Sequence, residues 1–144
     1  KMVLSDPQTL ITLGKRELAE GWAEAIKHGL ILDSDLVTSF EDNSKALMEV
    51  EPQISTEVIR RSVSIKARVV SQDQRETSGV RALLNYGHTI GHALEASTGY
   101  GEYLHGEAVS IGMMGSANTS PSSSGNIHNT MSNAGQISIP GVKR

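Results

Sequence analysis

Cysteine is absent from this chain, which excludes disulfide bonds and thiolate chemistry and leaves His, Asp and Glu as the available metal ligands. Aromatic residues make up 3% and apolar residues 38%, a small share for a globular chain. The formal net charge is −3, so we expect no basic surface that could hold nucleic acid or an anionic membrane. No apolar run approaches the ~18 residues of a membrane span, and no signal peptide opens the chain. We therefore expect a cytoplasmic protein with no nucleic-acid or membrane partner.

Helical periodicity extends over nearly all of residues 1–115 and predicts an all-α domain, since a chain of 144 residues suffices for one hydrophobic core. Leu18, Trp22 and Ile26 recur every four residues and predict a buried helix face. We expect Gly29 to end that helix and Ser55 to cap a later one. The expected helices cover residues 16–28, 34 or 35 onward, 44–50, 55–71, 81 onward and 105–114.

Residues 116–144 differ in composition, being rich in turn-forming residues and without apolar periodicity. We expect this segment to be a low-complexity, disordered tail, and we assign residues 1–115 to the helical domain. The chain also begins at Lys1 rather than at a methionine. Together with the polar tail, this indicates a fragment.

Four polar residues share one face of the helix expected from Arg81 onward. At about 100° per residue, Arg81, Asn85, His88 and His92 lie within roughly 60° of arc. Solvated helix faces favour Glu, Lys and Gln, which keep their side-chain entropy in water. A face with a cation, an amide and two imidazoles is instead typical of the wall of a polar pocket. Two histidines in such a wall suggest a metal site or proton transfer.

Three segments could supply ligands for a metal: His88 on this face, His105 at the start of the last helix and Glu24 in the first helix. Two imidazoles, a carboxylate and an open position would form a catalytic zinc site, where the metal acts as a Lewis acid. Spacing leaves two other interpretations open. His88 and His92, one helical turn apart, could bind a metal together, or the histidines could be hydrogen-bonded core residues.

Basic side chains in three segments could form a site for a phosphate or carboxylate group. Lys27 and Lys66 are flanked by apolar residues on predicted helices, and each alone is more typical of a lysine whose charge reaches solvent. Together with Arg81 they could hold an anion. Glu76 lies in a polar connection over residues 72–79 and is by default a surface charge.

Four motifs, in this order and spread over most of residues 3–115, resemble the 3-dehydroquinate synthase family. They are Gly21-Trp-Ala-Glu-Ala-Ile-Lys-His-Gly-Leu-Ile31, Lys66-Ala-Arg-Val-Val70, Arg81-Ala-Leu-Leu-Asn-Tyr-Gly-His-Thr-Ile-Gly-His-Ala-Leu-Glu95 and Leu104-His-Gly-Glu-Ala-Val109. The resemblance implies the helical C-terminal domain of that family. It also assigns roles to residues that spacing leaves open.

In the family that this chain resembles, a metal and two acid–base groups take part in catalysis. The resemblance implies that Glu24, His88 and His105 bind the metal, zinc or cobalt. His92 would then belong to the substrate and proton-transfer site rather than to the metal. Glu76 corresponds to a carboxylate assigned to acid–base work, and one extra residue between it and the next motif weakens that correspondence.

Other matched positions contact the substrate and the cofactor. Those implied to hold the phosphate, carboxylate and hydroxyl groups of the substrate, or to line its site, are Lys27, Lys66, Arg81, Asn85, His88 and His105, with Lys27 also taking part in catalysis. Those implied to touch NAD are Thr9, Leu10, Ile11 and Thr12.

The implied reaction belongs to the shikimate pathway of aromatic amino-acid biosynthesis. It converts a sugar-acid phosphate, 3-deoxy-D-arabino-heptulosonate 7-phosphate, to 3-dehydroquinate and phosphate, with transient oxidation of a ring hydroxyl by NAD. Family members, which we expect to form homodimers, also have an N-terminal α/β nucleotide-binding domain that has no counterpart here. After Met114 the sequence departs from the family's pattern. We therefore expect this chain alone to be inactive; another sugar-phosphate cyclase and a non-catalytic helical module are the alternatives.

Overall fold

The computed structural model describes residues 4–75, 79–99 and 101–119, and in these residues all regular structure is helical. This confirms the predicted all-α class. None of the described helices combines the length and the hydrophobicity that crossing a membrane requires. The elements are two 3-10 helices, η1 (Pro7–Thr12) and η2 (Val80–Asn85), and six α-helices: α1 (Lys15–Leu32), α2 (Ser34–Asp42), α3 (Ser44–Met48), α4 (Pro52–Gln72), α5 (His88–Thr98) and α6 (His105–Thr119).

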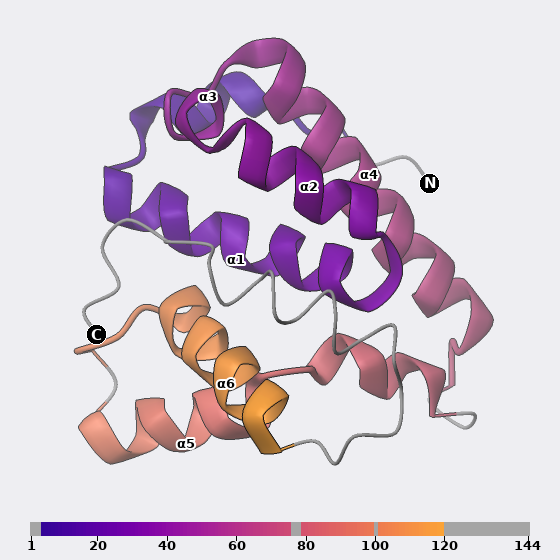
Figure 1. The fold of residues 1–144 in the computed structure, drawn as a ribbon, viewed down its shortest axis with the longest axis vertical. Coiled ribbons are helices and arrows are strands. Elements are labelled where there is room, and N and C mark those ends of the chain that lie inside the picture. Colours follow the sequence, from indigo (N-terminus) through magenta and orange to yellow (C-terminus); the bar gives the residue numbers. More distant parts are fainter. Residues whose placement is uncertain (1–3, 76–78, 100, 120–144) are drawn as a thin grey trace.

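Helix α1 is the central element of the described fold. It packs against α2 and α4 on one side and against α6 on the other, so that the α5–α6 pair lies across α1 from α2 (Figure 1). The predicted face of Leu18, Trp22 and Ile26 is buried in the main hydrophobic cluster. The indole of Trp22 meets the ring of Phe40 edge to face, with ring centroids 5.9 Å apart. Because α1 contacts α2 and α4 as well as α6, its side chains can reach a site beside the α5–α6 pair.

Two predicted helix ends are wrong: a contact between helices accompanies the first difference and a local side-chain cap the second. Helix α1 continues through Gly29 to Leu32, because the missing side chain of Gly29 makes room for Val37 of α2. Helix α4 begins at Pro52 rather than at Ser55, which is fully buried inside the helix. Its cap is Glu51, whose carboxylate accepts a hydrogen bond of 2.8 Å from the backbone N–H of Ile54.

The single helix predicted from Arg81 onward is also wrong. The segment forms the 3-10 helix η2, which ends at Asn85, and α5 begins anew at His88. Gly87 separates the two elements with φ +79°, a left-handed conformation that few residues other than glycine adopt. The predicted polar face is therefore divided between two elements, and only His88 and His92 remain one turn apart on the same helix.

Glycine and alanine bring α5 and α6 into close contact. A methyl group at Gly112 would overlap the backbone carbonyl of Gly87, and one at Gly91 would press on the backbone of Ala108. Ala108 is fully buried. The small residues at positions 108 and 112 of α6 therefore allow α5 to approach this helix closely.

Helix α6 continues past residue 115, the predicted end of the domain, as far as Thr119. The expectation of disorder from residue 116 onward is thus wrong for the first residues of that segment. Residues 120–144, which contain the rest of the predicted tail, lie outside the described residues. 

Candidate functional site

Three potential metal ligands from three different helices converge beside α1. Glu24 of α1, His88 at the first position of α5 and His105 at the first position of α6 each offer one donor atom, and these atoms lie within 4.8 Å of one another. A carboxylate and two imidazoles are a donor set that suits zinc. Among the described residues, no group of three potential metal ligands contains both His88 and His92. The alternative metal site formed by these two histidines therefore lacks a third ligand.

The ring of His88 is held with one nitrogen toward its own backbone and one toward Glu24. Its Nδ1 lies 3.3 Å from the carbonyl oxygen of Tyr86, to which it can donate a hydrogen bond. Its Nε2 lies 3.7 Å from Oε1 of Glu24. Burial and the nearby charge of Lys27 lower the pKa of His88, although the Tyr86 carbonyl and Glu24 oppose this shift. The neutral ring with its proton on Nδ1 leaves Nε2 free to bind a metal.

Lys27 and Glu24 form an ion pair on the same face of α1. The ammonium nitrogen of Lys27 lies 2.7 Å from Oε1 of Glu24, and its side chain is only 2% exposed, whereas that of Glu24 is 37% exposed. Burial lowers the pKa of Lys27; Glu24 opposes the shift and the positive charge of Lys66 adds to it. Burial raises the pKa of Glu24, but the hydrogen bond and charge of Lys27 outweigh it, so its pKa lies below the ordinary value. The carboxylate of Glu24 is therefore ionised at neutral pH.

The other residues expected to hold the substrate lie on neighbouring elements. Lys66 is an exposed residue of α4, close enough for its charge to affect the pKa of Lys27. Arg81 is half-buried in η2, which packs against α4 and α1, and its backbone N–H donates to Oδ2 of the buried Asp73 at 3.2 Å. Asn85 is exposed at the end of η2. Glu76 lies outside the described residues.

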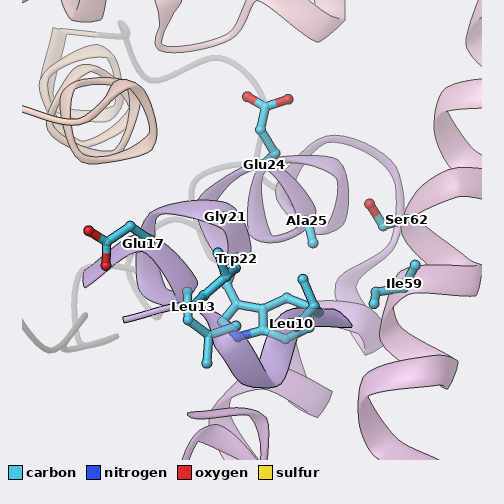
Figure 2. A pocket seen from close by; sticks show the side chains of 10 residues that line it. Leu10, Leu13, Glu17, Gly21, Trp22, Glu24, Ala25, Ile59 and Ser62 are labelled. Atoms are coloured by element: carbon cyan, nitrogen blue, oxygen red, sulfur yellow. The ribbon is translucent and has the colours of Figure 1, made fainter. Parts of the chain in front are cut away.

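The segment expected to touch NAD is the 3-10 helix η1. Thr9 and Thr12 turn their hydroxyls back to backbone carbonyls of the same turn, Ile11 is 69% exposed, and Leu10 packs on the core. Leu10 is one wall of a cleft of about 200 Å³ between η1, α1 and α4. Figure 2 shows Trp22 in the same wall, whereas the carboxylate of Glu24 points away from it.

Comparison with known proteins indicates the family of this chain. A family described as "3-dehydroquinate synthase C-terminal" matches residues 21–138. The chain belongs to the 3-dehydroquinate synthase family. The 3-dehydroquinate synthase of Rhodopirellula baltica is 52% identical over 113 residues, which are 78% of this chain and 30% of that protein. The corresponding enzyme of Bordetella pertussis is 52% identical over 120 residues, or 83% of this chain and 33% of that protein.

A solved structure supports the same fold. ValA, the 2-epi-5-epi-valiolone synthase of Streptomyces hygroscopicus with NAD⁺ and Zn²⁺ bound, is 33% identical and aligns with a TM-score of 0.70. The match covers 76% of this chain and 30% of ValA. This chain thus spans about a third of the length of the 3-dehydroquinate synthases it matches. The family match also continues to residue 138, beyond Met114, where we expected the family's pattern to end.

Two acidic residues, one inside the Leu-His-Gly-Glu motif and one directly before the first motif, connect α6 to α1, a function that the sequence pattern did not reveal. Glu107, from the Leu-His-Gly-Glu motif, forms a two-point ion pair with Arg16, at 2.6 and 2.7 Å. It also accepts the backbone N–H of Leu104, and Arg16 lowers its pKa further than burial raises it. Glu20 accepts the backbone N–H of Gly106 at 2.8 Å. These contacts fix the first turn of α6, which contains His105.

Another residue of these motifs contacts two histidines. The carboxylate of Glu95 lies 3.0 Å from Nδ1 of His92 and 3.3 Å from Nδ1 of His105. The rings of His88, His92 and His105 form a cluster with centroids 5.2 to 5.5 Å apart. His92 is 63% exposed, so it can meet a ligand from solvent. In the sequence, only the position of Glu95 three residues after His92 could have indicated that the two side chains meet.

Proposed function

We propose that this chain forms the metal- and substrate-binding half of a 3-dehydroquinate synthase active site. The reaction would convert 3-deoxy-D-arabino-heptulosonate 7-phosphate to 3-dehydroquinate and phosphate. The observation that carries the proposal is the convergence of Glu24, His88 and His105 beside the buried Lys27. The relatives that are 52% identical, all 3-dehydroquinate synthases, support this substrate over others.

Glu24, His88 and His105 would hold a divalent metal, zinc or cobalt. When bound, the metal would polarise a substrate hydroxyl and lower its proton affinity. The donor set fits, since His88 presents Nε2 to the site and the pKa of Glu24 lies below its ordinary value. The carboxylate is therefore ionised and the imidazole neutral, as metal binding requires.

The basic residues around this centre would bind the anionic groups of the substrate. Lys27, Lys66 and Arg81 would hold the phosphate and carboxylate, and Asn85 would hydrogen-bond a hydroxyl. The positive charge of Lys66 contributes to the lowered pKa of Lys27, so two positive charges lie close together, an arrangement that a bound anion stabilises. These charges would also stabilise the phosphate group as it leaves.

Proton transfer would be the role of His92, Glu76 and Lys27. His92 is exposed next to the proposed metal ligands, with Nδ1 toward Glu95, so its Nε2 would be the atom that takes up or releases a proton. NAD, touched by residues 9–12 of η1, would supply reversible hydride removal. The proposal includes a cytoplasmic location, a homodimeric full-length enzyme and a sugar-acid phosphate as the partner, without nucleic acid or membrane.

We propose further that the 144-residue chain alone does not convert the heptulosonate phosphate to product. Its described residues form helices only, whereas a dinucleotide is usually bound by an α/β unit with a parallel sheet. The purified chain, mixed with NAD⁺, zinc and the heptulosonate phosphate, should release no inorganic phosphate above the background rate. Release at an enzymatic rate would contradict this part of the proposal.

Zinc titration of the purified chain tests the site itself. We expect one equivalent to bind with a dissociation constant of about a micromolar or less, and His88→Ala to abolish binding. The matched control is His92→Ala, which removes a neighbouring imidazole that is not a proposed ligand and should leave the stoichiometry unchanged. Absence of zinc uptake by the wild-type chain would refute the site and favour a non-catalytic helical module.

A second candidate is another sugar-phosphate cyclase, because ValA has the same fold and 33% identity. The residues that would differ are those facing the substrate's carboxylate. A full-length 3-dehydroquinate synthase in which this segment replaces its own would decide. Activity with the heptulosonate phosphate supports the first candidate, and activity only with a sugar phosphate that has no carboxylate supports the second.

A further inference from the structure

We propose that Glu95 is a positioning residue that fixes the rings of His92 and His105 at the same time. The inference rests on the proposed function, because His105 is one of the proposed metal ligands. Glu95 belongs to α5, one turn after His92, and reaches across to the first residue of α6. It would therefore connect the proposed metal centre to the proposed proton-transfer group.

The geometry gives each oxygen of Glu95 its own partner. Oε2 lies 3.0 Å from Nδ1 of His92, and Oε1 lies 3.3 Å from Nδ1 of His105. The side chain of Glu95 is 13% exposed, while those of His92 and His105 are 63% and 45% exposed. The carboxylate is thus shielded by the two rings that it contacts, which are stacked with centroids 5.5 Å apart.

This arrangement selects one tautomer for both rings. An ionised carboxylate can only accept hydrogen bonds, so each ring must place its proton on Nδ1. Nε2 of His105 then remains as the unprotonated nitrogen that can bind a metal, and Nε2 of His92 as the nitrogen that can exchange a proton with substrate. A carboxylate behind a metal-binding histidine orients the ring and raises its basicity, and its loss typically weakens metal binding about 10- to 100-fold.

His88 obtains the same tautomer in another way, which provides an internal reference. Its Nδ1 faces the Tyr86 carbonyl rather than a carboxylate. A change at Glu95 should therefore alter the rings of His92 and His105 and leave that of His88 unchanged. Loss of folding would instead alter all three.

Nitrogen NMR of the histidine rings in the metal-free chain tests the inference directly, with Glu95→Gln as the variant. In the wild type we expect His92 and His105 to carry the proton on Nδ1, and in Glu95→Gln we expect both rings to become mixtures of the two tautomers. The control is Glu102→Gln, which removes an exposed carboxylate from the loop directly before α6 and should change the tautomer of neither ring. Unchanged tautomers in Glu95→Gln would overturn the proposal.

Zinc affinity supplies the second readout. We expect Glu95→Gln to bind zinc about 10- to 100-fold more weakly than the wild type, still with one equivalent. Because the donor atoms of His92, Glu95 and His105 also lie within 4.8 Å of one another, a second equivalent lost in Glu95→Gln would make Glu95 a ligand and refute the positioning role. If the wild type binds no zinc, the proposed function fails, whereas the tautomers of the metal-free chain still decide the role of Glu95.

Discussion

Replacement of Gly112 by alanine should separate α5 from α6 and disturb the site between them. A methyl group at this position would overlap the carbonyl oxygen of Gly87 and approach the backbone N–H of Gly91. Both obstacles are backbone atoms, which cannot rotate away as a flexible side chain can. The helices must therefore move apart, and the movement acts on the residue directly before His88.

The expected magnitude follows from two opposing effects. Alanine is favoured over glycine inside a helix by about 1 kcal/mol. Overpacking of a close contact costs about 1–3 kcal/mol. Since the contact is with backbone on both sides, we expect the upper part of that range and a net loss of about 2 kcal/mol in the free energy of unfolding.

Gly21→Ala is the matched control for this prediction. Gly21 is also inside a helix, α1, but nothing lies within 4 Å of the position that its methyl group would occupy. We expect this variant to gain about 0.5–1 kcal/mol from helix propensity alone. Urea denaturation of the two variants and the wild type measures the difference, and zinc titration measures the effect on His88. If Gly112→Ala is stabilised as much as Gly21→Ala, the close contact between α5 and α6 does not exist.

Three further predictions concern charged groups of the described fold. Lys27→Met should weaken the binding of inorganic phosphate at least about tenfold, as measured by NMR titration. It should change the free energy of unfolding by less than about 1 kcal/mol, because water can solvate the partly exposed Glu24 and the cost of burying the ammonium disappears. A loss of several kcal/mol would contradict this. Arg16→Met should lower the urea midpoint of unfolding, because it leaves the buried Glu107 without its cation, and it should leave the midpoint almost unchanged in a Glu107→Gln background. Burial and the charge of Lys27 lower the pKa of His28 below 6.5. As the pH falls, the unfolded chain therefore takes up a proton at this histidine at a higher pH than the folded chain does. Stability should be complete above about pH 6.5 and fall as the pH drops below it, and His28→Gln should reduce this slope in denaturation at several pH values.

The faces of the longer helices could be predicted from the sequence, because they depend on a repeat that each helix contains. Leu18, Trp22 and Ile26 lie in the core as their spacing indicates. The break after Asn85 could not be predicted in this way, since the polar residues on either side keep the helical spacing. Gly87 was visible, but the close contact with α6 that leaves no room for a side chain there is contained in no local pattern.

The candidate site shows the same division between local and tertiary information. The histidines stood out because imidazoles are uncommon on a solvated helix face. Glu95 and Glu107 did not, because glutamate is an ordinary residue of exposed helix surfaces. Their roles depend on which residues of other elements lie opposite them: His105 for Glu95, and Arg16 for Glu107.

The position of His105 depends on interactions with both α1 and α5. Glu107 and Glu20 bind the first turn of α6 to α1, while Glu95 contacts the ring from α5. The other proposed ligands, Glu24 and His88, belong to these same two helices. A metal bound by all three ligands would therefore be held by α1, α5 and α6 together, and each helix contact that orients His105 would also stabilise the metal centre. This explains how a chain with few aromatic residues can place three ligands from distant segments within 4.8 Å: short polar contacts and close glycine packing hold α5 and α6 beside α1, and α1 itself is anchored in the hydrophobic core.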